Sequence, residues 1–299
     1  MFKFSFPKPD GDDQESNAGE SVSSNTNNLH WLSCEKVTVS PSHLKHMLTR
    51  QSSASQLKLQ GVFLAHLSTK SAVQSAFETS DGDSSIKLAE QLHSDLIPAK
   101  YEGGLKIWEC TDDLLGWLIA AGPNVCLSNK NVLDLGCGTG LLGIAALKAG
   151  ASVVFQDYNK EVLDACTIPN VLLNLTDEES QSLIDSQGKS SCEFYSGDWS
   201  SFVDKLQEGR TEMLKFDYIL TSETIYNSEN YSKLINVFKK CLKNSGTVYL
   251  AAKTYYFGVG GGTRQFETAL QHDSSFKSEV CWKCSSGVSR EILKISLTS

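Results

Sequence analysis

The sequence predicts an α/β fold in which a parallel sheet carries helices on both faces. From residue 131 to residue 297, short apolar segments typical of strands alternate with longer segments of helical periodicity. A glycine-rich turn joins the first strand to the first helix within VLDLGCGTGLLGIAALKAG, residues 132–150. Strands that alternate with helices at this spacing form a parallel sheet, because each connection must cross back over one face.

The predicted elements follow one another in a regular order. A helix over 86–97 comes first and must end before Pro98, because the residue before a proline disfavours the helical region. The first strand, residues 131–135, leads to a helix over 139–149 with Gly150 beyond it. The remaining elements are strands at 152–156, within 192–199, at 216–223, 246–253 and 291–297, helices at 160–175 (broken near Pro169), 228–243 and 263–272, and an acidic, serine-rich loop at 176–190.

The N-terminal part of the chain differs in composition from the rest. Residues 1–30 are rich in Ser, Asn, Asp and Gly, so they are expected to form a disordered tail. Residues 31–90 are an extension whose order the sequence leaves open, because short apolar patches at 37–39 and 61–66 lie among serine-rich stretches. The extension is either weakly structured or an arm that contacts a partner or substrate. The regular domain is expected over 91–299.

Composition and charge exclude several classes of protein. The net charge of −8 and pI near 5.3 argue against a protein that wraps nucleic acid, but they suit a basic protein partner. Nine cysteines without a disulfide framework indicate reduced thiols and a cytoplasmic or nuclear protein. No signal-peptide core and no apolar run approaching about 18 residues is found, so no membrane association is expected.

The glycine-rich turn fits two registers, and they favour different cofactors. Gly138, Gly140 and Gly143 fit G-x-G-x-x-G, the fingerprint of dinucleotide binding. Gly136, Gly138 and Gly140 fit the tighter pattern G-x-G-x-G. A Walker phosphate loop is excluded, because no Gly-Lys-Ser/Thr follows. In either register the site lies outside the carboxyl end of the first strand.

Residues at three strand ends favour S-adenosylmethionine over NAD. Asp134, just before the glycines, would repel a pyrophosphate but suits a cofactor that carries an amine and a sulfonium. Asp157 closes the second strand, where a carboxylate accepts hydrogen bonds from ribose hydroxyls, which supports a nucleoside cofactor without deciding between the two. After the next strand, Gly197 precedes Asp198, which can read an adenine amino group, and Trp199, which can stack on the ring. Together these residues predict S-adenosylmethionine as the cofactor, with no metal ion required.

Six stretches between residues 95 and 299 resemble a known family. They are YEGGLKIWECT (101–111), VLDLGCGTGLLGI (132–144), FQDYN (155–159), SGDWS (196–200), ILTSETIY (219–226) and YYFGVGGG (255–262). The chain resembles the class I S-adenosylmethionine-dependent methyltransferases, and more narrowly the histidine protein methyltransferases that modify a large-subunit ribosomal protein. The resemblance implies a Rossmann-like, seven-stranded methyltransferase sheet with helices on both faces and an N-terminal extension.

The resemblance also implies which residues contact the cofactor. They are Ile107, Trp108, Glu109, Cys110, Thr111, Gly136, Gln156, Asp157, Tyr158, Gly197, Asp198, Trp199 and Ser222. By its own chemistry, Glu109 could meet the methionine amine, or it could be a solvated residue before a helix. Trp108 could form a wall of the methionine pocket, or it could belong to the core. Helix capping is the alternative role for Asp134 and Asp157.

Glu223 and Tyr226, at the end of the fourth predicted strand, are the candidate catalytic residues. Glu223-Thr-Ile-Tyr226 resembles the acid-x-x-aromatic signature of related protein methyltransferases. Glu223 is expected to hydrogen-bond the far N–H of an acceptor imidazole, and Tyr226 to form a wall of the acceptor slot. Structural support of the loop is the alternative for both. The glycines of 255–262 indicate either a loop that approaches the substrate or a plain connection.

The resemblance implies a histidine acceptor on a large-subunit ribosomal protein. Imidazole titrates near about 6.5 and is mostly neutral at pH 7, whereas a lysine near about 10.4 must first lose a proton, so a histidine enzyme needs orientation of one ring nitrogen more than a strong base. On this resemblance we expect a monomeric protein-histidine N-methyltransferase that acts on a basic ribosomal protein without binding nucleic acid directly. A lysine acceptor, or a catalytically silent cofactor-binding partner of a ribosomal protein, are the alternatives.

Two other groups of residues contain metal-ligating side chains but lack the spacing of a metal site. Cys281 and Cys284 lack a second pair at zinc spacing, and His43 and His46 lack the glutamate of H-E-x-x-H. The sequence therefore predicts no metal site, and the two histidines are expected on the surface.

Overall fold

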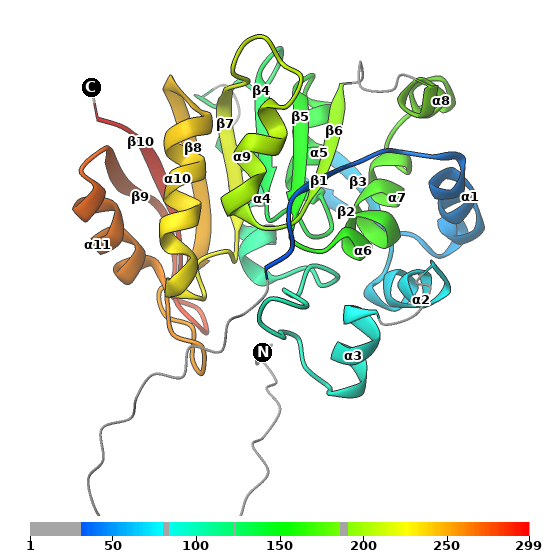
Figure 1. Cartoon of the computed structure of the whole chain (residues 1–299), viewed down its shortest axis with the longest axis horizontal. Helices are drawn as coiled ribbons and strands as arrows, with labels where there is room; N and C mark the ends of the chain where they lie inside the picture. Colours follow the sequence, from blue (N-terminus) through cyan, green and yellow to red (C-terminus); the bar gives the residue numbers. More distant parts are fainter. Residues whose placement is uncertain (1–30, 80–83, 122–123, 186–190, 299) are drawn as a thin grey trace, which may run out of the picture.

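An eight-stranded sheet forms the centre of the computed structural model, which describes residues 31–79, 84–121, 124–185 and 191–298 (Figure 1). The expected tail, residues 1–30, lies outside the described residues. In spatial order the strands are β1 (Glu35–Val37), β6 (Cys192–Ser196), β5 (Ser152–Asp157), β4 (Asn131–Leu135), β7 (Phe216–Ser222), β8 (Leu242–Lys253), β10 (Arg290–Leu297) and β9 (Phe276–Cys284).

The helices lie between and around these strands. They are α1 (Pro41–Arg50), α2 (Thr69–Thr79), α3 (Ser85–Gln91), α4 (Glu109–Ala121), α5 (Leu141–Lys148), α6 (Lys160–Val162), α7 (Ile168–Leu172), α8 (Asp177–Asp185), α9 (Trp199–Gln207), α10 (Tyr231–Cys241) and α11 (Thr263–Asp273), with short turns η1 (Gln51–Ser53), η3 (Leu163–Thr167) and η4 (Ser228–Asn230). A separate hairpin consists of β2 (Ser55–Leu59) and β3 (Val62–His66).

Seven strands of the sheet have the arrangement that the resemblance implies. β6, β5, β4, β7 and β8 run parallel, so their carboxyl ends share one edge. β10 is antiparallel to both β8 and β9, which corrects the expectation of a wholly parallel sheet. The sequence patterns do not reveal β9, which joins β10 through a short connection, as antiparallel neighbours can. β1 pairs antiparallel with β6, with Glu35 opposite Ser196, and makes the eighth strand.

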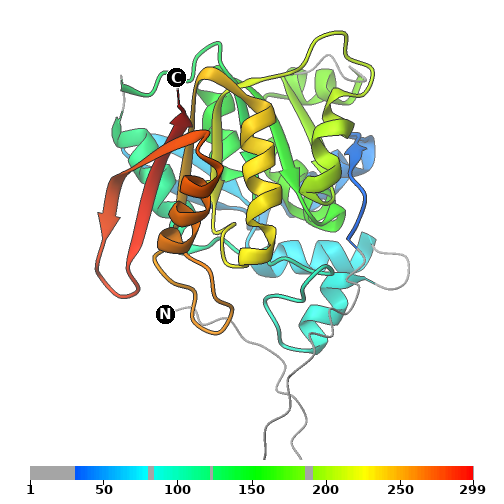
Figure 2. The same cartoon turned by 60° about the vertical axis from the view of Figure 1, so that its left-hand side comes forward.

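Helices cover both faces of the sheet (Figure 1, Figure 2). Successive strand residues point to opposite faces, so each strand contributes to two apolar clusters. Val132 and Phe155 pack with α4 and α5 on one face, whereas Leu133 and Val154 pack with α9 and α10 on the other. By the same alternation, Asp134 points toward α5, where its carboxylate accepts a hydrogen bond from Gly143.

Residues 31–79, whose order the sequence leaves open, pack against the domain. Asn174 fixes the β2–β3 hairpin, because its side chain both accepts from the Ala65 N–H at 3.0 Å and donates to the Ala65 carbonyl at 2.7 Å. His43 is buried and not at the surface, and its Nε2 is hydrogen-bonded to Asp164 Oδ1 at 3.0 Å. Four apolar side chains of the segment join the cluster on the α5 face: Val37, Val39, Met47 and Leu64.

Three helices lie in segments where the sequence predicts a loop or no helix. α8 occupies residues where the sequence indicates a loop, and three acidic side chains in its first turn suit the positive end of the helix dipole. The patterns also do not reveal α4 and α9. The helix expected over 160–175 is divided into α6, the π-helical turn η3 and α7. Pro169 lies in the first turn of α7, where its missing N–H costs little.

Candidate active site

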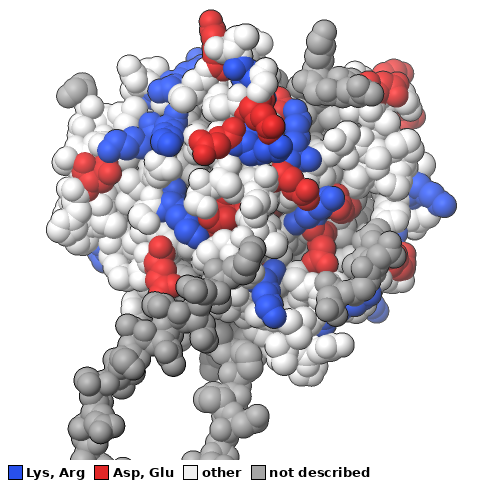
Figure 3. Space-filling view, in the orientation of Figure 1, with Lys and Arg blue, Asp and Glu red and all other residues white. Residues whose placement is uncertain are grey.

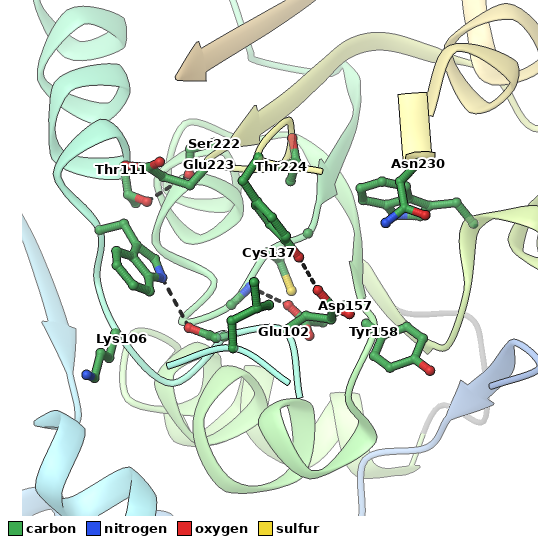
Figure 4. Close-up of a pocket in the computed structure, with 18 of the residues that line it drawn as sticks. Glu102, Lys106, Thr111, Cys137, Asp157, Tyr158, Ser222, Glu223, Thr224 and Asn230 are labelled. Atoms are coloured by element: carbon green, nitrogen blue, oxygen red, sulfur yellow. Dashed lines mark hydrogen bonds between the residues drawn. The ribbon is translucent and has the colours of Figure 1, made fainter. Parts of the chain in front are cut away.

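A pocket opens at the carboxyl ends of β4, β5, β6 and β7, where ligands bind in sheets of this kind. In Figure 4, Thr111 and Ser222 lie at one end of it, Tyr158 and Asn230 lie at the other, and Asp157 lies between them. The sequence-predicted residues that line this pocket are Trp108, Thr111, Gly136, Gly138, Asp157, Tyr158, Gly197, Asp198, Trp199, Ser222, Glu223 and Tyr226.

The glycines of the first turn lie where the surrounding chain leaves no room for a side chain. Gly136 and Gly138 have φ of 66° and 49°. A Cβ at Gly136 would lie 2.6 Å from Thr224 Cγ2, and one at Gly138 would lie 2.9 Å from the Gly104 carbonyl oxygen. Gly140 is the N-cap of α5 and does not line the pocket. The turn therefore needs glycine at the pocket wall both for its backbone conformation and for close approach.

The Asp157 carboxylate is held at the end of β5 by backbone donors. Its Oδ2 accepts from the Gly138 N–H at 2.9 Å, and its Oδ1 accepts from the Asn159 N–H at 3.1 Å. Burial raises the pKa of Asp157 to about 6, and the backbone hydrogen bonds oppose that rise. Asp157 therefore presents a nearly buried acceptor to the pocket, with little freedom to move.

Asp134 lies beneath the pocket instead of lining it. Its Oδ2 accepts from the Gly143 N–H at 2.7 Å, and its Oδ1 has no hydrogen-bond partner among the described residues. Burial raises the pKa of Asp134 to about 8. A Cβ at Gly143 would lie 2.2 Å from Phe155 Cε1, so α5 packs tightly here. Asp134 thus ties α5 to β4, which differs from the cofactor contact expected from the sequence.

The turn after β6 is fixed by Gln156, which also lies behind the pocket wall. Gln156 Nε2 donates to the Gly197 carbonyl at 2.8 Å, and its Oε1 accepts from Trp199 Nε1 at 2.8 Å. Asp198 is the N-cap of α9, accepting from the Ser200 N–H at 3.0 Å, and its other oxygen pairs with Lys233 at 2.8 Å. Both carboxylate oxygens of Asp198 are therefore bound within the protein. This differs from the expectation that Asp198 binds the adenine amino group.

Only two side chains of the segment 107–111 reach the pocket. Trp108 Nε1 donates to the Gly103 carbonyl at 3.1 Å, and Thr111 is hydrogen-bonded to Ser222 at 2.7 Å. The other three have different surroundings: Ile107 packs on the core, Cys110 is fully buried, and Glu109 lies 3.8 Å from Arg290 Nη1. The resemblance implies cofactor contacts for all five residues because it covers the whole stretch 101–111.

Glu223 is buried and paired with a lysine. Its backbone has φ of 58°, an unusual conformation for a residue with a side chain, and it follows β7 directly. Glu223 Oε1 lies 3.3 Å from Lys253 Nζ at the end of β8. The same ammonium lies 5.6 Å from the ring centroid of Trp108 and 5.5 Å from that of Tyr256. A carboxylate, an ammonium and two aromatic rings therefore form one buried group beside the pocket.

Tyr226 closes the other side through Glu102. The Tyr226 hydroxyl donates to Glu102 Oε2, and Glu102 Oε1 accepts from the Ala99 N–H at 2.9 Å (Figure 4). Asn159 Oδ1 accepts from the Glu102 N–H at 3.0 Å. Burial raises the pKa of Glu102, and burial together with the nearby Glu102 carboxylate raises the pKa of Tyr226. This contact joins the end of β7 to the segment that precedes α4.

Several residues that line the pocket were not singled out from the sequence. Glu102, Gly103 and Gly104 lie within the quoted stretch 101–111, so a signal for them existed. Trp31 and Asn230 carry no motif. The full set is Trp31, Leu96, Glu102, Gly103, Gly104, Lys106, Cys137, Thr139, Thr224 and Asn230.

The loop 255–262 is anchored at one end and exposed at its tip. Tyr255 and Phe257 are 51% and 74% exposed, whereas Tyr256 between them is fully buried. The Gly262 N–H donates to the Ile225 carbonyl at 3.1 Å, which ties the loop to the segment after β7.

The described residues can also be compared with the requirements of a metal site and of a membrane span, and their surface charge is shown in Figure 3. Among the described residues, no group of three or more His, Cys, Asp or Glu side chains could hold a metal ion. Within the same part of the chain, no helix has the length and apolar character needed to cross a membrane. On the face shown in Figure 3, basic and acidic side chains are interspersed.

Comparison with known proteins gives a family match and several relatives. The family model described as "Lysine methyltransferase" matches residues 98–256. The chain is 42% identical over 232 residues to the Histidine protein methyltransferase 1 homolog of Bos taurus, covering 73% of this chain and 62% of that protein. The Dictyostelium discoideum protein of the same name is 43% identical over 205 residues, covering 68% of this chain and 60% of that protein. The chain thus spans less than two thirds of the length of these relatives.

A solved structure shares the fold. SMU.776, complexed with SAH, superposes with a TM-score of 0.50 at 13% identity, covering 82% of this chain and 56% of that chain. At this identity the likeness concerns the fold alone.

Proposed function

This chain belongs to the lysine methyltransferase family, whose model matches more than half of its length, and we propose that it transfers a methyl group from S-adenosylmethionine to a histidine side chain of a protein. Relatives at 42–43% identity are named as histidine protein methyltransferases, which favours histidine over lysine. The observation that carries the proposal is the convergence of four strand ends on one pocket that contains Gly136, Asp157, Trp199 and Glu223.

The residues present fit that cofactor. Gly136 and Gly138 line the pocket with bare backbone, because a Cβ there would clash with Thr224 and Gly104, and Asp157 places a buried acceptor where ribose hydroxyls bind in such sheets. Trp108 and Trp199 add aromatic walls. Bound there, S-adenosylmethionine supplies a methyl group activated by a sulfonium, so the protein has to supply alignment and exclusion of water.

Glu223 and Tyr226 are the residues we assign to the acceptor. The Glu223 carboxylate is fixed by Lys253 and can accept the N–H of the remote imidazole nitrogen. That hydrogen bond selects the tautomer whose lone pair lies on the other nitrogen, which is the nucleophile. Tyr226 is held by Glu102 and forms a wall of the acceptor slot. Because neutral imidazole already has a lone pair at pH 7, orientation matters more than a strong base.

We propose a basic ribosomal protein of the large subunit as the substrate. The net charge of −8 supports a basic partner, because opposite net charges speed encounter. The nine cysteines are all free thiols, which supports a reducing compartment, the cytoplasm or nucleus.

The decisive experiment identifies the modified amino acid. The protein is incubated with tritiated S-adenosylmethionine and ribosomal proteins from cells that lack it, and the labelled band is hydrolysed and separated. We expect label in methylhistidine, and much less of it with Glu223→Gln. Methyl-lysine would establish the lysine alternative, and absence of label with intact cofactor binding would indicate a catalytically silent partner.

The rate profile against pH provides an independent measure. With a histidine acceptor and saturating S-adenosylmethionine, which removes the effect of pH on cofactor binding, the initial rate should rise through about pH 6–7 and level off by about pH 8. A lysine acceptor would keep gaining rate toward about pH 10.

A further inference from the structure

The segment that precedes β1 lies at the pocket. Trp31 lines it together with Tyr158 and Trp199. The ring centroids of Trp31 and Tyr158 are 5.8 Å apart, with their planes at 83°. Lys233 Nζ lies 3.6 Å from the Trp31 ring centroid and 2.8 Å from Asp198 Oδ2. One face of the indole is therefore occupied by an ammonium that is itself fixed by a carboxylate.

Backbone contacts fix this segment to two strand-end turns. The Leu32 N–H donates to the Tyr158 hydroxyl at 3.2 Å, and the Leu32 carbonyl accepts from the Asp198 N–H at 2.8 Å. A Cβ at Gly197 would lie 2.6 Å from the Cα of Cys34, so the segment passes directly over Gly197. The extension thus has a fixed register against the turns after β5 and β6.

We propose that Trp31 is part of the cofactor site and closes its adenine end. The inference rests on the proposed function only in that the ligand is S-adenosylmethionine. Asp157 marks the ribose position at the end of β5, and the neighbouring strand end, after β6, is then the place for the base. Trp31 lies between this strand end and that of β5, because the carbonyl of the next residue, Leu32, accepts from the Asp198 N–H and the Trp31 ring lies beside Tyr158.

The chemistry at this end favours an aromatic contact with the base. Asp198 is capping α9 and paired with Lys233, so its oxygens are engaged within the protein. Trp31, Tyr158 and Trp199 are the aromatic side chains there. Ring contact with a nucleobase typically contributes enough to change affinity roughly 5- to 100-fold when one aromatic side chain is removed.

The test compares affinity for S-adenosylhomocysteine in the wild type and four variants by titration calorimetry. Trp31→Ala should raise Kd roughly 5- to 100-fold, and Trp31→Phe should retain most of the affinity because a ring remains. Gly197→Ala should also raise Kd, since its Cβ displaces the segment while Trp31 itself is unchanged. Phe63→Ala is the matched control, because Phe63 is 48% exposed, has Lys58 Nζ 5.1 Å over its ring, and does not line the pocket.

A second ligand locates the effect. 5′-Methylthioadenosine lacks the amino-acid part, so Trp31→Ala should weaken it by the same factor as S-adenosylhomocysteine. Unchanged Kd in Trp31→Ala, or equal weakening in Phe63→Ala, would overturn the proposal. A wild-type protein that binds S-adenosylhomocysteine but labels no histidine would remove the proposed function and leave the role of Trp31 intact. Failure of the wild type to bind it would remove both.

Discussion

Lys253 Nζ lies 3.3 Å from Glu223 Oε1, and the two side chains are only 6% and 5% exposed. Lys253 is the last residue of β8 and Glu223 directly follows β7, so the ion pair joins two neighbouring strand ends. We infer that this pair fixes the carboxylate that we assign to the acceptor.

The first prediction concerns stability. Glu223→Gln and Lys253→Met should each lower the free energy of unfolding by about 3–5 kcal/mol, because each leaves a buried charge without its partner. The double variant should recover most of that loss, since neither charge remains. Urea unfolding of the three variants measures the coupling, and simply additive losses would show that the side chains act independently.

The second prediction separates chemistry from binding. Glu223→Gln should lower kcat on the histidine substrate far more than it changes Kd for S-adenosylhomocysteine, because the carboxylate contacts the acceptor. Glu229→Gln, at an exposed position a few residues along the chain, is the control and should behave as wild type. Full turnover in Glu223→Gln would remove the role given to that side chain.

The third prediction concerns the affinity for the cofactor against pH. The pKa of Asp157 is raised to about 6 by burial, and ribose hydroxyls bind the ionised form better. Affinity for S-adenosylhomocysteine should therefore rise from about pH 5 to about pH 7 and be flat above. Asp157→Asn should bind about 1–3 kcal/mol more weakly at pH 7.5 and lose this dependence. Calorimetry across the range provides the values; a flat wild-type profile would contradict the assignment.

The fourth prediction concerns stability against pH. Burial raises the pKa of Asp134 to about 8, so between about pH 4 and pH 8 the folded protein holds a proton that the unfolded chain has lost. Asp134 therefore makes the free energy of unfolding fall as the pH rises toward 8, and it causes no further fall above pH 8. Asp134→Asn removes that contribution and keeps an acceptor for Gly143. The Tm of Asp134→Asn relative to wild type should increase from pH 5 to pH 8 in thermal melts; a constant difference would refute it.

Local patterns predicted much of the fold and the place of the site. Apolar strands and the glycine turn are read from neighbouring residues, so the sequence located β4, β5, β7 and the pocket edge. The alternation of Asp134 with Leu133 and Leu135 on opposite faces could also have placed its carboxylate toward α5.

The remaining features depend on distant partners. β1 has only three residues and pairs with the edge of β6, so the short apolar patch at 37–39 is too brief to predict a strand by itself. Asp198 is engaged by Lys233 of α10, and Glu109 by Arg290 of β10, and neither partner is adjacent in sequence. Trp31 lacks a motif for the same reason, since its neighbours come from turns after β5 and β6.

The pairing of β1 with β6 also sets an order of events during synthesis. Ser196 is hydrogen-bonded to Glu35, which precedes it by 161 residues. At about 5–20 residues per second, the segment carrying Trp31 waits on the order of 10–30 s for its partner strand to be made. Until then β1 has no strand to pair with, and the wall that Trp31 forms cannot assemble. A nascent chain therefore acquires this wall of the pocket only after β4, β5 and β6 have been made.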